Sequence, residues 1–132
     1  REPKFAKLNS LDLSYAHLVP SSLKPLLNGQ VFKGCESLNF HYNMLGEDGA
    51  KLLARTESFP NLRFLNVGFC QMTIDGLQEL VSSPVMQNIE RLNLVGNNIN
   101  EKVIKAIIKS PYLKNLKTLV INPRMLRATE RT

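Results

Sequence analysis

The sequence has few of the residues and motifs on which metalloproteins and nucleotide-dependent enzymes depend. It contains two cysteines and two histidines among 132 residues, and their spacing does not suit a zinc site. Glycine-rich phosphate-binding loops and dinucleotide-binding turns are absent. Cys35 and Cys70 set no disulfide framework, so we expect two buried free thiols, which suits a reducing compartment. The sequence therefore predicts no metal ion, no cofactor and no catalytic residues.

Long apolar segments are also missing. No apolar run approaches the roughly 18 residues that a membrane-spanning helix needs. The charged N-terminus, from Arg1 to Lys7, contains no apolar stretch of the kind found in signal peptides. The hydrophobic content of 43% is nevertheless ample for a packed core. These features favour a folded cytoplasmic protein.

A 27-residue repeat runs through almost the whole sequence. Its anchor is a leucine in all five copies: Leu11, Leu38, Leu65, Leu92 and Leu119. The positions six and three before each anchor, and two and seven after it, are apolar in every copy. The copy from Ile89 to Ile99, IERLNLVGNNI, shows the pattern L-x-x-L-x-L-x-x-N-x-L most clearly. Such self-similarity predicts a solenoid of stacked units.

Each repeat is expected to contain one strand and one helix. The L-x-L segment predicts a short strand, in which side chains alternate between the interior and the surface. Helices are predicted in TIDGLQELVSS and NEKVIKAIIKS, where apolar residues share one face and Thr73 and Asn100 can act as N-caps. Pro25 would disrupt the interior of a helix, so residues 19–29 are expected to be short or irregular.

The pattern resembles leucine-rich repeats, and a strand plus a full helix in 27 residues resembles their ribonuclease-inhibitor-like class. The segment SPYLKNLKTL, from Ser110 to Leu119, is similar to tandem repeats of bacterial proteins that include secreted effectors. The resemblance implies an α/β solenoid, a right-handed superhelix with a parallel concave sheet and convex helices. It also implies that Asn43, Cys70 and Asn97 hydrogen-bond turn backbone groups of adjacent repeats.

The two ends of the array are less regular than its middle. Ala16 stands where Asn43 stands one repeat later, and Arg124 at the same position cannot be buried without a large cost. Repeat five is therefore expected to leave the regular path at Asn122–Arg124. Neither end shows a cap with a polar outer face, and the sequence does not begin with methionine. We expect residues 1–132 to form a single array within a longer protein.

The repeat geometry predicts which side chains lie together on the concave face. An asparagine row and an aromatic stripe at the strand ends are its main features, and exposed aromatic residues are typical of protein-binding surfaces. In the alternative interpretation, the rings only shield the edge of the core and the asparagines hydrogen-bond one another. The predicted binding residues are Asp12, Tyr15, Asn39, His41, Tyr42, Phe64, Asn66, Phe69, Arg91 and Asn93.

The same geometry brings Ser14, His41 and Asp12 together. Ser14 and His41 are 27-residue equivalents, so neighbouring strands place them about 5 Å apart. A hydrolase would also need an oxyanion hole and a pocket that excludes water. A single shallow sheet offers neither, so we interpret these residues as polar groups of a binding face.

The net charge of +6 comes entirely from the C-terminal end of the chain. From Glu101 onwards there are eight basic residues and two acidic ones, whereas the rest of the chain is balanced. Lys102, Lys105 and Lys109 have helical spacing and could bind nucleic acid or acidic phospholipid. No aromatic residues alternate with them, and no nucleic-acid-binding module is present. A solvated helix face is the simpler interpretation, and an acidic protein is an equally compatible partner.

The function favoured by the sequence is protein–protein recognition by a monomer through the concave face of the solenoid. The partner is expected to be another protein rather than nucleic acid or a membrane. An effector of this kind would act in the cytosol of a host cell. The alternatives are anion binding by the basic C-terminal end and a structural spacer within a larger protein.

Overall fold

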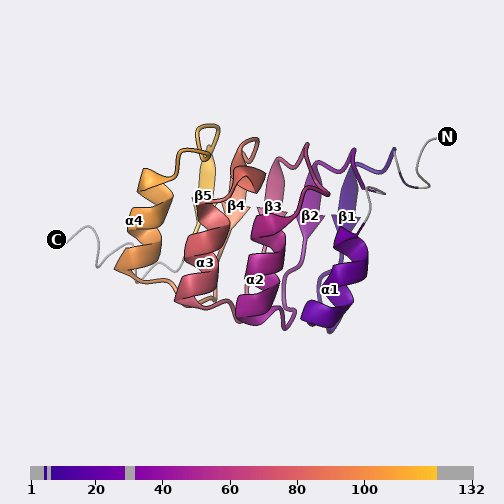
Figure 1. Cartoon of the computed structure of the whole chain (residues 1–132), viewed down its shortest axis with the longest axis horizontal. Helices are drawn as coiled ribbons and strands as arrows, with labels where there is room; N and C mark the ends of the chain where they lie inside the picture. Colours follow the sequence, from indigo (N-terminus) through magenta and orange to yellow (C-terminus); the bar gives the residue numbers. More distant parts are fainter. Residues whose placement is uncertain (1–4, 6, 29–31, 122–132) are drawn as a thin grey trace.

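The computed structural model describes residues 5, 7–28 and 32–121. In this part of the chain, parallel strands form one sheet in the order β1-β2-β3-β4-β5, and helices cover one of its faces (Figure 1). Every strand has three residues. The strands are β1 (Ser10–Asp12), β2 (Ser37–Asn39), β3 (Phe64–Asn66), β4 (Arg91–Asn93) and β5 (Thr118–Val120).

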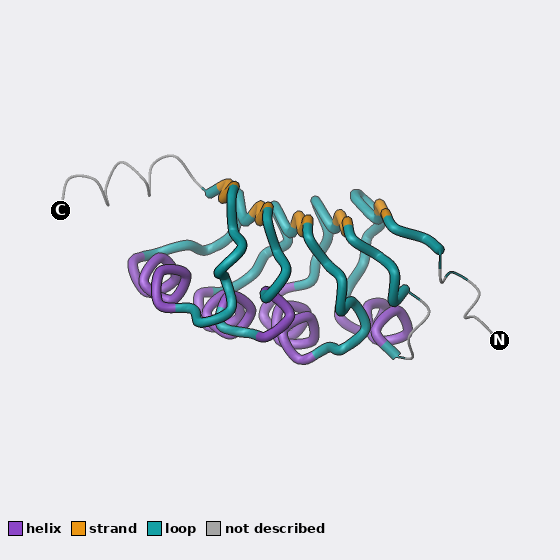
Figure 2. The backbone as a smooth tube through the Cα atoms, turned by 90° about the horizontal axis from the view of Figure 1, so that it is seen from above, coloured by secondary structure: helices purple, strands orange, loops and turns teal. Residues whose placement is uncertain are grey.

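The register of the sheet confirms the predicted repeat. Leu11 pairs with Leu38, and each later anchor pairs with the anchor 27 residues further along the chain. The strands lie on the concave side of the curved molecule and the helices on its convex side (Figure 2). The predicted α/β solenoid is therefore observed.

The helices return the chain from one strand to the next. They are α1 (Pro20–Leu27), α2 (Gly46–Arg55), α3 (Ile74–Val81) and α4 (Glu101–Lys109), with a short 3-10 helix η1 (Pro84–Met86). Thr73 caps α3 by accepting a hydrogen bond from the Gly76 amide at 3.1 Å. Asn100 caps α4 by accepting from the amides of Lys102 and Val103. No helix in the described ranges has both the length and the apolar character to cross a membrane.

The first return segment was predicted to be short or irregular, and it forms a short but regular helix. Residues 20–27 form a helix of 8 residues, as long as α3, with Pro25 inside it. Pro20 lies at the helix start, where a fixed φ is favourable. Pro25 removes one backbone hydrogen bond close to the end of the helix. The fully buried Leu23 holds α1 against the core and offsets this loss.

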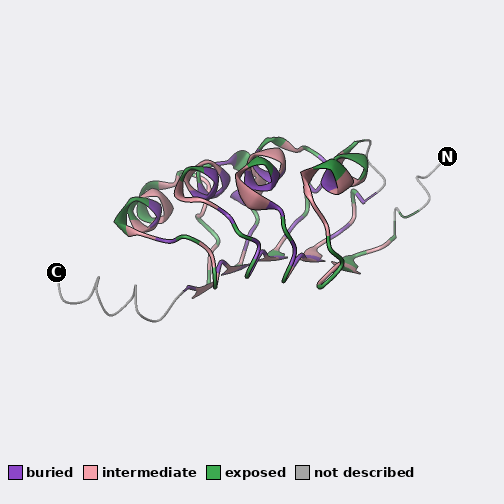
Figure 3. Cartoon of the chain, turned by 90° about the horizontal axis from the view of Figure 1, so that it is seen from below, coloured by how far each residue is buried: buried purple, intermediate pink, exposed green. Residues whose placement is uncertain are grey.

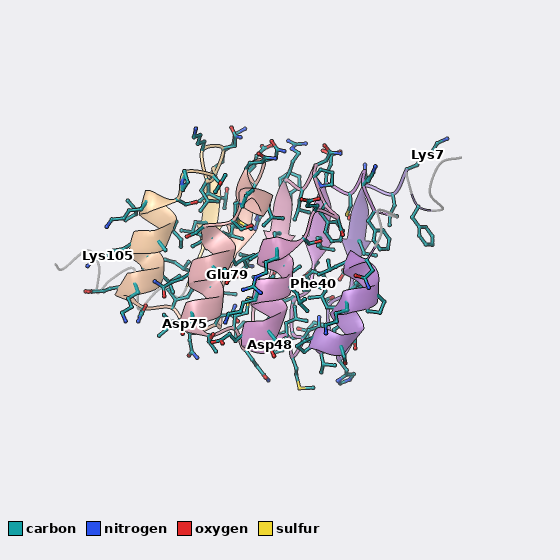
Figure 4. The ribbon with its side chains drawn as sticks, viewed as in Figure 1. Lys7, Phe40, Asp48, Asp75, Glu79 and Lys105 are labelled. Atoms are coloured by element: carbon teal, nitrogen blue, oxygen red, sulfur yellow. The ribbon has the colours of Figure 1, made fainter. Side chains whose placement is uncertain are left out.

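The core fills the space between the sheet and the helices (Figure 3). Anchor leucines point inward from the strands, and Leu38, Leu65 and Leu92 are at most 3% exposed. Phe40, two residues after its anchor, is fully buried behind the helices (Figure 4). Burying one such side chain contributes roughly 1.5–3 kcal/mol to folding.

Asn43 connects the turns of two successive repeats. Its Oδ1 accepts hydrogen bonds from the amides of Ala16 and Leu18, and its Nδ2 donates to the carbonyls of Leu13 and Phe40. Asn97 makes the equivalent bonds two repeats later, to backbone groups that include the Met72 amide and the Val67 carbonyl. The hydrogen bonds that the family resemblance implies for Asn43 and Asn97 are therefore confirmed. Arg124, at the same position, lies outside the described residues.

Cys70 replaces asparagine in this ladder. Its thiol donates to the Phe40 carbonyl across 3.1 Å. Burial raises the pKa of the thiol to about 11, although a hydrogen bond with the Asn43 backbone opposes the shift. Cys35 is also buried, and both cysteines are free thiols as predicted.

Two further hydrogen-bonded ladders join the repeats, and the sequence analysis did not predict them. Serine hydroxyls donate to helix-end carbonyls of the preceding repeat: Ser58 to Leu27, Ser83 to Ala54 and Ser110 to Val81. Asparagine amides donate to carbonyls near the strand starts: Asn61 to Lys33, Asn88 to Pro60 and Asn115 to Gln87. The acceptors within each ladder are 27 residues apart, so the repeat fixes the bonding pattern as well as the core.

Candidate protein-binding surface

Three aromatic rings form a continuous column beside the carboxyl ends of the strands. We call Tyr15, Tyr42 and Phe69 the aromatic stack. The ring centroids of Tyr15 and Tyr42 are 4.9 Å apart and those of Tyr42 and Phe69 are 4.7 Å apart, with nearly parallel planes. The residues are 65%, 45% and 39% exposed, respectively. The rings therefore pack on one another and keep a large exposed surface, rather than simply covering the core.

The backbone at the aromatic stack is in the left-handed region. The φ angles are 55° at Tyr15, 58° at Tyr42 and 52° at Phe69. This region is unfavourable for bulky residues and is usually taken by glycine. Gly96 occupies the equivalent position of the next repeat with a φ of 75°. A Cβ atom at Gly96 would overlap the Phe69 ring, so the stack ends over this glycine.

His41 supports the stack from the concave side. Its ring makes edge contacts with the rings of Tyr42 and Phe69, with centroid distances of 4.9 and 5.5 Å. The Nδ1 atom lies 3.2 Å from Oδ1 of Asn66. The missing side chain of Gly68 leaves the space that the His41 ring fills. The aromatic stack and the concave face are thus joined through one histidine.

The concave asparagines hydrogen-bond their own turns. Oδ1 of Asn39, Asn66 and Asn93 accepts from the backbone amide two residues later, at 2.9, 2.8 and 3.1 Å. This local bond ends each strand and starts the following turn. Hydrogen bonds between these asparagines were an alternative prediction, and none occurs among the described residues. Their Nδ2 groups therefore stay available at the surface.

A shallow groove of about 320 Å³ lies on the concave face over β2, β3 and β4. Phe64 is 37% exposed in this groove, and the guanidinium of Arg63 lies 5.1 Å from its ring centroid. Arg91 is the register partner of Phe64 on the next strand. The concave groove is lined by Ser37, Leu38, Asn39, Phe64, Leu65, Asn66, Arg91 and Asn93. It thus brings together half of the predicted binding residues, and four others are the three residues of the aromatic stack and His41.

Asp12, the last predicted binding residue, lies on β1 and bonds Ser14. The Ser14 hydroxyl donates to Oδ1 of Asp12 at 2.6 Å, and the Ser14 amide donates to the same atom at 2.9 Å. These two bonds lower the pKa of the Asp12 carboxyl. A catalytic triad needs the hydroxyl on the histidine and the carboxylate behind it. Here the carboxylate holds the hydroxyl directly, so the three side chains do not form a triad.

The structure also contains a row of alternating charges that the sequence analysis missed. We call Glu36, Arg63, Glu90 and Lys117 the charge ladder; they lie two residues before successive anchors. Arg63 bonds Glu90 at 2.5 Å and Glu36 at 3.0 Å, and Lys117 bonds Glu90 at 3.2 Å. The bond from Arg63, followed by that from Lys117, lowers the pKa of Glu90. The 27-residue spacing of alternating charges was the signal that could have revealed this ladder.

The predicted anion-binding lysines lie away from the concave face. Lys102, Lys105 and Lys109 are exposed residues of α4, and α4 lies on the convex side with Lys105 (Figure 4). In the part of the chain that the structure describes, none of the three forms an ion pair, and no group of three histidine, cysteine or acidic residues gathers to hold a metal ion. Anion binding by α4 stays a prediction.

Comparison with known proteins identifies one of the repeats. Residues 60–81, which include β3 and α3, match the family model described as Leucine Rich repeat. A search of curated proteins finds no match. The match supports a leucine-rich-repeat protein, and the sheet with its convex helices is an α/β leucine-rich-repeat solenoid.

Proposed function

We propose that this chain recognises another protein through the aromatic stack and the concave groove beside it. The observation that carries the proposal is the conformation of the stack. Three bulky residues adopt a left-handed backbone that costs on the order of 1 kcal/mol each, although Gly96 shows that glycine fits this position. Unusual backbone conformations that keep large rings exposed are typical of binding surfaces rather than of cores.

The composition of the surface supports the same conclusion. Tyrosine and phenylalanine provide large contact areas at a small cost in conformational entropy. The polar groove next to the stack supplies hydrogen-bond donors that can orient a partner. Leucine-rich repeats commonly mediate protein–protein interactions, and their curved sheets provide extended binding surfaces.

A double variant tests this assignment. Tyr42→Ala with Phe69→Ala removes two of the stacked rings, which are both partly exposed. We expect the affinity for the partner to fall about 30-fold or more, as at other aromatic hot spots. Affinity purification with the wild-type chain identifies the partner, and calorimetry then measures the dissociation constants.

The matched control is Ile108→Ala on α4. Ile108 is an apolar residue with 76% exposure on the convex side, so its loss tests whether any exposed apolar residue matters. We expect wild-type affinity for this variant. Circular dichroism checks that each variant is folded. A folded double variant with wild-type affinity would contradict the proposed function.

We also propose that the repeats are of the ribonuclease-inhibitor-like class and that the chain acts as a monomer. The class is supported by helices of 8 to 10 residues in each return segment. Light scattering coupled to gel filtration measures the mass. A dimer mass at micromolar concentration would contradict the second part.

A further inference from the structure

We propose that the concave groove binds a carboxylate side chain, preferably a glutamate, from an acidic segment of the partner protein. The inference rests on the proposed function and names the chemistry that the groove selects. Its centre is Arg91 on β4, with Asn93 on the same strand and Asn66 on the neighbouring strand. Phe64 forms the apolar side of the site.

Arg91 differs from the other arginines of the described ranges. Arg63 binds Glu36 and Glu90, and Arg55 holds Glu79 with two hydrogen bonds of 3.0 Å. The Arg91 side chain has no such partner within the described residues, where it is exposed on the concave face. A guanidinium is a rigid fork of donors that matches a carboxylate. The missing carboxylate is the group that the partner would supply.

The neighbouring side chains favour the same ligand. Oδ1 of Asn66 and of Asn93 already accepts a backbone hydrogen bond, so mainly the Nδ2 donors remain. A carboxylate only accepts hydrogen bonds, and it would satisfy these amides together with the guanidinium. A lysine or arginine of a partner would instead meet donors and a like charge. The polarity of the concave groove therefore selects acidic residues.

The dimensions of the sheet allow these groups to act together. Neighbouring strands are about 4.8 Å apart, and residues i and i+2 of a parallel strand are about 6.6 Å apart. Arg91, Asn93 and Asn66 thus surround a space in which one carboxylate can reach all three. The exposed Phe64 ring can pack against the methylene groups of a glutamate. Asp12 lies three strands away on β1, about 14 Å at this spacing and beyond the Debye length in physiological salt.

The experiment uses a random 12-residue peptide display library selected on the wild-type chain. The selected peptides are synthesised, and calorimetry measures their binding to wild type, to Arg91→Ala and to Arg91→Glu. Lys24→Ala is the matched control, because it removes one exposed positive charge from the convex α1. For each acidic residue of a peptide, the glutamine or asparagine analogue is measured as well.

We expect the selected peptides to carry glutamate or aspartate near an apolar residue. Arg91→Ala should weaken their binding about 10-fold or more, as expected for loss of a charged hydrogen bond. The neutral peptide analogue should lose as much, and combining the two changes should add little. Arg91→Glu should select basic peptides from the library, whereas Lys24→Ala should bind as wild type does.

Other results separate the two proposals. Peptides that lose binding with Tyr42→Ala and Phe69→Ala but not with Arg91→Ala would overturn the carboxylate site and leave the proposed function standing. Peptides that bind all these variants equally would count against both. A library from which no acidic peptide is selected also overturns the carboxylate site.

Discussion

The concave face and the interior between the repeats use the same residue types in different ways. Asn43 and Asn39 are four residues apart, yet Asn43 engages both side-chain atoms with backbone groups while Asn39 engages only its oxygen. Arg63 is held by two carboxylates, whereas Arg91, one repeat later and on the strand itself, meets none among the described residues. The number of side-chain hydrogen-bonding groups that have no partner among the described residues thus distinguishes a residue exposed for binding from one that stabilises the fold.

The largest difference between the two regions is expected in their stability. Asn43→Ala removes four hydrogen bonds to backbone groups, one of them buried and three partly buried, and we expect a loss of about 3 kcal/mol in the free energy of unfolding. Asn39→Ala removes one partly exposed bond and should cost about 1 kcal/mol or less. Urea denaturation measures both values. Equal losses would mean that the concave asparagines are as structural as the buried ones.

A substitution at Gly96 tests whether the aromatic stack is held as firmly as the interior between the repeats. Gly96→Ala adds a Cβ in a left-handed conformation and pushes against the Phe69 ring, so we expect a loss of about 2 kcal/mol. Gly46→Ala is the control, since Gly46 has a φ of 61° and open space around its Cβ. It should cost only the backbone strain, about 1 kcal/mol. If Gly96→Ala costs no more than Gly46→Ala, the ring moves freely and the stack is not a fixed surface.

The smallest effect concerns acid stability. The pKa of Glu90 is lowered in the fold, so its contribution is present above the ordinary value of 4.5 and is lost as the pH falls through the lower folded value. Wild type should therefore lose more stability than Glu90→Gln between about pH 5 and pH 3. Arg91→Ala should keep the wild-type acid profile, because Arg91 holds no carboxylate in the described part of the chain. Urea midpoints across this pH range measure both, and parallel profiles for wild type and Glu90→Gln would contradict the role of the charge ladder.

The sequence predicted most of the fold because the repeat has no insertions. One apolar column located every strand, and local polar residues such as Thr73 and Asn100 located two helix starts. Pro25 predicted a short or irregular segment, and α1 is short but regular, because the burial of Leu23 outweighs the local propensity of proline. The members of the candidate surface followed from column positions alone.

The interactions within that surface could not be predicted in the same way. The stacking of Tyr15 on Tyr42 depends on a left-handed turn, and aromatic residues do not signal such a turn in a sequence. Whether Asn66 bonds its neighbours or its own backbone depends on rotamers that periodicity does not determine. Among the described residues Arg91 has no carboxylate partner, and this can be seen only once the charged side chains of that part of the chain have been placed.

The ladders in which side chains bond the backbone of another repeat all have the same direction. Ser58, Asn61, Cys70 and Asn97 each extend a side chain to the backbone of the repeat that precedes them in the chain. A repeat that has just left the ribosome therefore carries the groups that attach it to the repeat made before it. The backbone that receives these groups is already complete at that moment. Assembly of the solenoid can thus proceed in the order of synthesis, one repeat at a time.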